Sequence, residues 1–220
     1  MTSREFRQRL VELAGGNQID LPAAIIEPLF TYFDVLSRWN SKINLTSLPL
    51  RPPSDEAFRR LLLEPLEAAA YLPSGPQLWF DIGSGGGSPA IPLKLARPSL
   101  RLTMVESKTR KAAFLRELIR VLGLSNATVS CERIEDLAVR DGVQSVAALV
   151  TLRAVRLDEG LVRAVRRLTT ERGELWIFSA TGVPELLPWF SRQSVVRLLA
   201  TDTSSLLRYA PTMFHVEQSS

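Results

Sequence analysis

From Gln77 onward, short apolar runs alternate with stretches that have the residue spacing of amphipathic helices. The runs are QLWFDI, RLTMVE, ATVSC, VAALVT and ELWIFS, and KTRKAAFLRELIRVLGL lies between the second and the third. In that stretch apolar residues form a helical stripe, and Gly123 is well placed to end the helix. Strands that alternate with helices favour a parallel, doubly wound α/β sheet. Two later runs, SVVRLL and SSLLRYA, lack a crossover helix between them, so we expect an antiparallel hairpin.

The residues before this alternation have a helical pattern instead. In LPAAIIEPLFTYFDVLSRW, apolar side chains recur on one helical face from Ile25 to Leu36. A Pro-rich break, LPLRPPS, precedes a second helical stretch from about Asp55 to Tyr71, and PSGP then forms a turn. The sequence therefore predicts a helical extension over residues 1–75 and an α/β domain over residues 76–220.

Composition limits the class of protein. No apolar run approaches the roughly 20 residues of a membrane helix, and the first residues, MTSREFRQRL, are charged where a secretory signal is apolar. We therefore expect a cytoplasmic protein with no membrane partner. Cys131 and His215 are the single residues of their types, which excludes an internal disulfide and a Cys/His zinc site, and we expect no metal. His215 lies far from any motif.

Residues 81–90 read DIGSGGGSPA and contain four glycines directly after the first predicted strand. In an open parallel sheet this loop lies at the carboxyl edge, where ligands bind. Glycines there let backbone N–H groups approach a ligand, while a tight turn without a ligand is the alternative. The cluster favours the ligand site.

Two carboxylates help to select the ligand. Gly85 and Gly87, with Glu106 about 20 residues later, fit a dinucleotide fingerprint, so a nicotinamide or flavin oxidoreductase remains an alternative. Asp81, however, suits a ligand with a positive end better than a pyrophosphate, and we expect no second domain for an oxidoreductase substrate. S-adenosylmethionine accounts for both features, with the glycines against its methionine and ribose part, Glu106 on the ribose and Asp81 toward the ammonium group.

The order and spacing of several stretches resemble one family. WNSKINLTS at residues 39–47, DIGSGGGSPAIPL, VESKTRKAAFL, ERIEDL and LRAV are similar to the bacterial ribosomal RNA small subunit methyltransferase G family, also called glucose-inhibited division protein B. The resemblance spans about Leu29 to Gly182. It implies an S-adenosylmethionine-dependent methyltransferase fold whose seven-stranded sheet ends in an antiparallel hairpin. It also implies methylation of guanine N7 in 16S rRNA, free or in the 30S particle, and we expect a monomer.

The resemblance also implies cofactor contacts at particular residues. They fall on Gly83 and Ser88 in the glycine turn, on Ile134 and Glu135 beside the adenine ring, and on Arg153 after the fourth strand. Without the resemblance, Arg153 has the pattern of a solvated arginine; at this edge of the sheet it becomes a candidate phosphate or base contact.

The chain departs from the family's usual residues at several positions. The family has a bulky apolar residue at Ser88, glycine at Ala90, serine at Leu152 and lysine at Thr181. A histidine aligns near Leu61, and Glu64-Pro65 stands where Asp-Ser is usual. The residues expected to face the RNA depart more from the family's usual residues than those expected to bind the cofactor. A cofactor-binding, RNA-associated protein with lost or altered methyl transfer is therefore a second hypothesis.

The proposed chemistry needs no general base, because guanine N7 carries a free lone pair at neutral pH, so catalysis is by alignment. Cys131 is predicted to be a small buried core residue rather than a nucleophile.

Trp39 and Asn40 could contact RNA, but a packing and capping pair that fixes the extension to the core explains them equally well. The net charge of +4 is compatible with an RNA partner. Candidate phosphate contacts, each of which also fits a solvated face, are Lys42, Arg51, Arg59, Arg60, Lys108, Arg110 and Lys111.

Overall fold

The computed structural model describes residues 1–180, 187–201 and 203–212. The helical extension has two long helices before the Pro-rich break and a second helical stretch of mixed type after it. The long ones are α1 (Ser3–Gly16) and α2 (Ala23–Asn40). The second stretch runs through α3 (Asp55–Phe58), the π-helical turn η1 (Arg59–Leu63), α4 (Glu64–Ala68) and the 3₁₀ turn η2 (Ala69–Tyr71). The helices predicted on both sides of the Pro-rich break are confirmed.

Seven strands form one sheet in the part of the chain that the structure describes. They are β1 (Leu78–Ile82), β2 (Arg101–Val105), β3 (Ala127–Ser130), β4 (Ala147–Arg153), β5 (Thr169–Ser179), β6 (Phe190–Arg197) and β7 (Ser205–Pro211). Their order is β3-β2-β1-β4-β5-β7-β6. Neighbours from β3 to β5 are parallel, and β7 is antiparallel to both β5 and β6. The predicted doubly wound sheet with a C-terminal antiparallel hairpin is confirmed.

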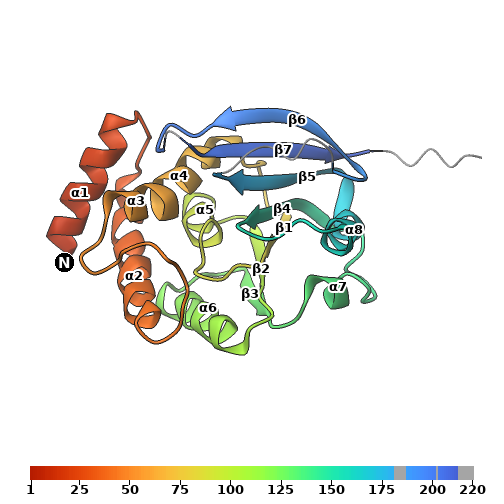
Figure 1. Ribbon diagram of the computed structural model, residues 1–220, viewed down its shortest axis with the longest axis horizontal. Coiled ribbons are helices and arrows are strands. Elements are labelled where there is room, and N and C mark those ends of the chain that lie inside the picture. Colours follow the sequence, from red (N-terminus) through yellow and green to blue (C-terminus); the bar gives the residue numbers. More distant parts are fainter. Residues whose placement is uncertain (181–186, 202, 213–220) are drawn as a thin grey trace, which may run out of the picture.

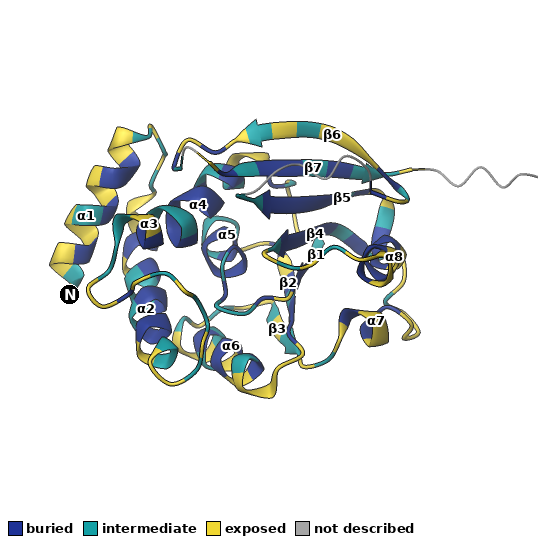
Figure 2. Ribbon diagram, in the orientation of Figure 1, coloured by how far each residue is buried: buried dark blue, intermediate teal, exposed yellow. Residues whose placement is uncertain are grey.

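Helices cover both faces of the sheet (Figure 1). They are α5 (Ala90–Ala96), α6 (Thr109–Val121), α7 (Ile134–Leu137) and α8 (Glu159–Leu168). Because strand side chains alternate between faces, Trp79 of β1 joins the hydrophobic cluster under α5 and α6, whereas Phe80 joins the cluster under α7 and α8. Figure 2 shows that the second half of β5 is mainly buried and that β7 mixes buried with part-buried residues, while β6 after Phe190 is exposed or part-buried.

The extension shares its core with one face of the sheet. Phe6 of α1 and Leu36 of α2 belong to the same hydrophobic cluster as Trp79 of β1 and Leu118 of α6. The rings of Phe6 and Phe58 pack 5.2 Å apart and tie α1 to α3. The boundary at residue 75 thus divides the sequence but not this core, and the two-part domain division stays a prediction.

Some expectations fail or fall outside the described residues. Cys131 was expected to be buried, but this is wrong: its side chain is exposed. The physical reason is that Cys131 follows the end of β3, an edge strand of the sheet. Thr181, Gly182 and His215 lie outside the described residues. Among the described helices, none has both the length and the apolar character needed to cross a membrane.

Candidate active site

The glycine turn connects β1 to α5 at the carboxyl edge of the sheet. Its backbone is tight, because the N–H of Gly83 donates to Val105 O at 2.8 Å and positive φ angles occur at Gly83 (+69°), Gly85 (+47°) and Gly87 (+84°). A Cβ at Gly83 would lie 2.7 Å from Val155 Cγ2, which follows β4. Glycine is required there by both backbone conformation and space.

Glu106 follows β2 and lies against this turn. Its Oε2 accepts a hydrogen bond from the N–H of Gly85 at 3.0 Å, and its Oε1 accepts one from the N–H of Lys108 at 2.8 Å. A carboxylate offers about four acceptor positions, so two remain for a ligand's hydroxyl groups. The structure therefore brings the predicted ribose-binding acid to the predicted turn.

Asp81 is the second-last residue of β1, next to the turn, and is only 1% exposed. Thr151 of β4 donates its hydroxyl to Asp81 Oδ1 at 2.5 Å, and Trp79 Nε1 donates to the same hydroxyl oxygen at 2.9 Å. Burial raises the pKa of Asp81 to about 6, although hydrogen bonds from the Thr151 and Ser84 hydroxyls and the charge of Arg153 oppose this. A buried carboxylate whose ionisation is costly is suited to a positively charged partner.

Arg153 ends β4 at the same edge. Its guanidinium pairs with Glu64 Oε2 at 2.8 Å, donates to the carbonyl of Arg60 and to Ser88 Oγ, and lies 4.7 Å from the ring centre of Phe178. Burial lowers the pKa of Arg153 from its ordinary value, and the Glu64 carboxylate is the main opposing influence. Its side chain is only 13% exposed, so the interpretation of a solvated arginine is wrong.

Glu64 stands where the family usually has aspartate. It is 2% exposed, and its second oxygen, Oε1, accepts from the Thr201 hydroxyl at 2.7 Å. One buried carboxylate therefore neutralises Arg153 and anchors the turn between β6 and β7. A buried ion pair whose remaining lone pairs are satisfied is the tolerable form of such a pair.

The π-helical turn η1 provides backbone acceptors at this point. The carbonyl of Arg60 accepts from Arg153, and the carbonyl of Leu61 accepts from Ser88 Oγ at 2.9 Å. Two departures from the family, Ser88 and Leu61, are thus joined by a hydrogen bond. Single π-helical turns occur frequently at functional sites.

These elements surround a cavity of about 430 Å³. Of the predicted site residues, Gly83, Gly85, Ser88 and Arg153 line it. The other lining residues come from α2, the loop that follows it, η1, the glycine turn, the start of α6 and the residue after β4: Leu36, Asn44, Leu45, Thr46, Ser47, Leu48, Arg60, Leu61, Ser84, Gly86, Lys111 and Ala154.

The other five predicted residues do not line the cavity. Asp81 and Glu106 are hydrogen-bonded to the glycine turn, whereas the remaining three have other surroundings. A Cβ at Gly87 would meet Ile91 Cγ1 at 3.0 Å, so this glycine serves helix packing. Ile134 and Glu135 begin α7; Ile134 is buried in the hydrophobic cluster on the α7 and α8 face, and neither residue lines the cavity. Their place beside an adenine ring stays a prediction.

Sequence reasoning missed Tyr32 and Thr151. The hydroxyl of Tyr32 on α2 donates to Gly86 O in the glycine turn at 2.8 Å. Tyr32 belongs to no motif of the sequence, so no local signal marked it as a contact of the glycine turn. For Trp39, packing is confirmed, because Nε1 donates to Glu117 Oε2 at 3.1 Å and its ring lies 5.8 Å from that of Phe114 on α6.

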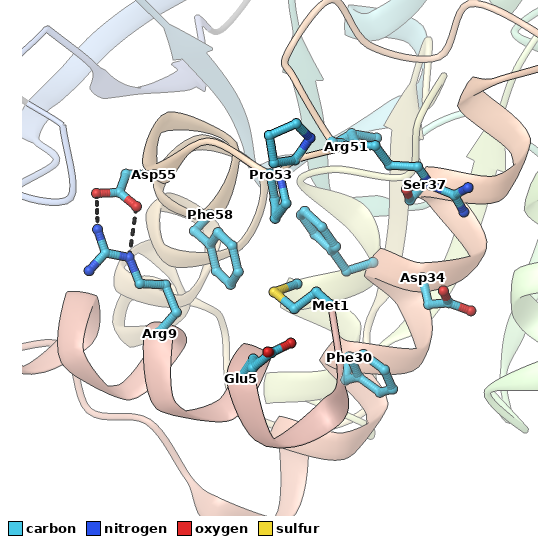
Figure 3. A pocket seen from close by; sticks show the side chains of 13 residues that line it. Met1, Glu5, Arg9, Phe30, Asp34, Ser37, Arg51, Pro53, Asp55 and Phe58 are labelled. Atoms are coloured by element: carbon cyan, nitrogen blue, oxygen red, sulfur yellow. Dashed lines mark hydrogen bonds and ion pairs between the residues drawn. The ribbon is translucent and has the colours of Figure 1, made fainter.

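A second cavity, of about 670 Å³, lies within the extension (Figure 3). Aromatic side chains including Phe30, Phe33 and Phe58 line it, and two arginines lie on its rim. These arginines have protein partners: Arg9 makes a bidentate contact with Asp55, and Arg51 Nε donates to Ser37 Oγ at 2.8 Å. Arg51, a predicted phosphate contact, lines this cavity, but none of the predicted cofactor contacts does. We therefore place the active site at the smaller cavity, where the buried charged groups converge.

Solved structures define the class of fold. The chain superposes on a SAM-dependent methyltransferase from Aquifex aeolicus with a TM-score of 0.55 at 13% identity, covering 71% of this chain and 93% of that one. A mutant of MtNAS in complex with S-adenosylmethionine gives a TM-score of 0.59 at 18% identity, covering 96% and 78%. The fold is that of the S-adenosylmethionine-dependent methyltransferases.

Sequence comparison narrows the class to one family. The family model described as rRNA small subunit methyltransferase G matches residues 25–182, and the chain belongs to this family. Proteins named ribosomal RNA small subunit methyltransferase G include one from Xylella fastidiosa, 40% identical over 73% of this chain and 72% of the relative. One from Paracoccus denitrificans is 38% identical over 69% and 74%. For a relative from another Xylella fastidiosa strain, at 44% identity, the chain spans about half the relative's length, 56%.

Proposed function

We propose that this protein transfers the methyl group of S-adenosylmethionine to N7 of a guanine in 16S rRNA. The observation that carries the proposal is the cavity in which the glycine turn of a methyltransferase fold meets Arg60, Lys111 and Arg153. Arg153 is paired with Glu64, and Arg60 lies 3.5 Å from Glu56. Family membership supports the reaction and the class of RNA. We place the protein in the cytoplasm as a monomer that acts on 16S rRNA or on the 30S particle.

The residues at the turn fit S-adenosylmethionine. Gly83 has a positive φ and no room for a Cβ beside Val155, and a turn without side chains at this point suits a ligand lying directly on the backbone. Asp81 is a buried carboxylate below the turn and suits the ammonium end of the cofactor, while Glu106 retains acceptor positions for ribose hydroxyls. Ser88 and Arg153 would border the methionine part, and Ile134 and Glu135 the adenine.

The bound cofactor supplies an electrophilic methyl group on a sulfonium. The chain's own contribution is to hold the acceptor base in line with that methyl group and to keep water and other nucleophiles out. Guanine N7 is unprotonated at neutral pH, so no side chain has to remove a proton before attack. The mechanism thus requires no catalytic histidine or cysteine, which agrees with the exposed position of Cys131 away from the cavity.

The cationic wall of the cavity favours RNA as the substrate. Arg60 and Lys111 from the predicted phosphate contacts line it, as does Arg153, the candidate phosphate or base contact. Arg59 instead donates to the carbonyl of Ala200, and Arg51 lines the second cavity. Sequence-specific RNA recognition commonly uses an unstacked base from a single-stranded loop, and a basic cavity beside the cofactor suits such a base.

The decisive experiment is incubation of 30S subunits and of naked 16S rRNA with methyl-labelled S-adenosylmethionine, followed by mapping of the labelled base. Label at guanine N7 is expected. Cofactor binding without label on either RNA would favour the second hypothesis, a binding protein, which the departures at Ser88 and Leu61 motivate. Titration with NAD tests the oxidoreductase alternative, which family membership disfavours, and binding of NAD without binding of S-adenosylmethionine would overturn the proposed function.

A further inference from the structure

Asn40 is the last residue of α2 and precedes a loop without helix or strand structure. Its side-chain Oδ1 accepts hydrogen bonds from the N–H of Leu45 at 2.9 Å and from the N–H of Thr46 at 3.0 Å. In turn, Thr46 Oγ1 accepts from the N–H of Leu48 at 3.2 Å. Two side chains thus provide the acceptors that regular secondary structure would otherwise supply for these amides.

The loop that Asn40 holds is part of the cavity wall. Residues 44–48 all line the cavity together with residues 83–86 and 88 of the glycine turn. The two walls also touch each other, because a Cβ at Gly86 would lie 3.2 Å from the carbonyl oxygen of Leu45. The carbonyl oxygen of Gly86 accepts from Tyr32 on α2. The extension therefore contacts the middle of the glycine turn from two directions.

The start of the loop is anchored as well. Trp39, next to Asn40, is hydrogen-bonded to Glu117 on α6, and α2 packs beside α5 and α6 (Figure 1). The end of α2 is consequently fixed to the α/β domain. The hydrogen bonds from Leu45 and Thr46 to Asn40 fix the middle of the loop relative to the end of α2, and Leu45 in turn lies against Gly86.

We propose that Asn40 is a positioning residue of the methyl-transfer site: its Oδ1 holds the Asn44–Leu48 loop against Gly86, so that loop and glycine turn form one preorganised cavity. This inference rests on the proposed function and assigns the helical extension a part in catalysis. Asn40 itself does not line the cavity, so it acts through the loop. Preorganisation lowers the entropic cost of ordering the site when its ligands bind.

The test compares three variants of the full chain: Asn40→Ala, Asn40→Asp and the matched control Asn17→Ala. Asn17 also caps a helix, donating its side-chain amide to Leu13 O at the end of α1, but it lies far from the cavity in sequence and does not line it. Calorimetric titration gives the affinity for S-adenosylmethionine, and labelled-methyl transfer to 30S subunits and 16S rRNA gives kcat and KM.

Asn40→Ala removes the acceptor of two backbone N–H groups and is expected to weaken cofactor affinity about 5- to 30-fold and to lower kcat/KM for RNA at least as much. Asn40→Asp keeps an acceptor oxygen and is expected to remain within about twofold of the wild type in both measurements. Asn17→Ala is expected to lower thermal stability while leaving affinity and transfer unchanged.

Wild-type affinity and transfer in Asn40→Ala would overturn the proposal, as would an Asn40→Asp variant as impaired as Asn40→Ala. If the alanine variant fails to fold, hydrogen exchange of the wild-type chain decides instead: the Leu45 and Thr46 amides should be protected, and rapid exchange at both would refute the role of Asn40. If the wild type transfers no label to RNA, the proposed function is refuted. The cofactor titration and the exchange data then still test whether Asn40 holds the loop against the glycine turn.

Discussion

Replacement of Asp81 by asparagine should make the ligand-free protein more stable at neutral pH and weaken its cofactor binding. The buried carboxyl has a pKa raised from the ordinary value of 3.8 to about 6. Asparagine has nearly the same shape, carries no charge, and keeps an Oδ1 that can accept from Thr151. The substitution therefore removes mainly the cost of ionising a buried group.

The sign and size of the stability change follow from linkage. Because the pKa is raised in the folded state, the folded chain binds this proton more tightly than the unfolded chain. The bound proton therefore stabilises the folded state. This stabilisation is complete below about pH 3.8 and is lost as the pH rises through about 6. The difference between the two pKa values corresponds to about 3 kcal/mol. Above pH 7, Asp81→Asn should thus exceed the wild type by up to about 3 kcal/mol in free energy of unfolding, and near pH 4 the two should agree.

Urea unfolding of the ligand-free proteins at pH 7.5 and pH 4.5 measures this difference. The matched control is Asp20→Asn, which removes an exposed carboxylate and should change the free energy of unfolding little at either pH. Titration with S-adenosylmethionine should show weaker binding by Asp81→Asn at pH 7.5. In the wild type, affinity should fall as the pH drops below about 6. An Asp81→Asn variant less stable than the wild type at pH 7.5, with unchanged cofactor affinity, would refute the reasoning.

Four further predictions concern the same edge of the sheet. Tyr32→Phe should weaken cofactor affinity several-fold, because it removes the hydroxyl that holds the glycine turn, whereas Tyr209→Phe on β7 should not; equal effects in a calorimetric titration would contradict this. Glu106→Gln should lose at least tenfold in cofactor affinity, since an amide NH₂ in place of Oε2 would oppose the N–H of Gly85; unchanged binding would remove Glu106 from the site. Gly85→Val should abolish binding while circular dichroism stays native, because a β-branched residue does not adopt φ of +47° without strain; wild-type affinity would exclude this turn as the site. Cys131 should react with a maleimide in the native state without loss of cofactor binding, and slow labelling would indicate a buried thiol.

Local sequence pattern was sufficient for the sheet and for the position of the glycine turn. Alternating strands and helices imply parallel pairing, and the absence of a crossover helix implies the terminal hairpin, whatever the details of packing. Asp81 and Glu106 could be placed for the same reason. Asp81 lies one residue before the end of its strand and Glu106 directly follows its own, so both had to reach one edge of the parallel sheet beside the turn.

Contacts between residues far apart in the sequence were decided only by the tertiary structure. Arg153 meets Glu64 across 89 positions, and Tyr32 meets Gly86 across 54. Neither pairing follows from periodicity, because each depends on how the extension docks on the sheet. The apolar stripe of α2 predicted a buried face but not which turn that face would touch. Exposure of Cys131 was misjudged for a related reason: a strand pattern does not reveal whether its strand lies at the edge of the sheet.

The sequence alone thus determined a parallel sheet with a glycine turn and two acids at its carboxyl edge, because strand direction and alternation are encoded in short-range pattern. Only the tertiary structure decided that the helical extension completes the cavity, through Tyr32 and the loop held by Asn40, and that Arg153 is buried against Glu64. Those features depend on the docking of distant segments, which is set by the complementarity of whole surfaces rather than by any one stretch of residues.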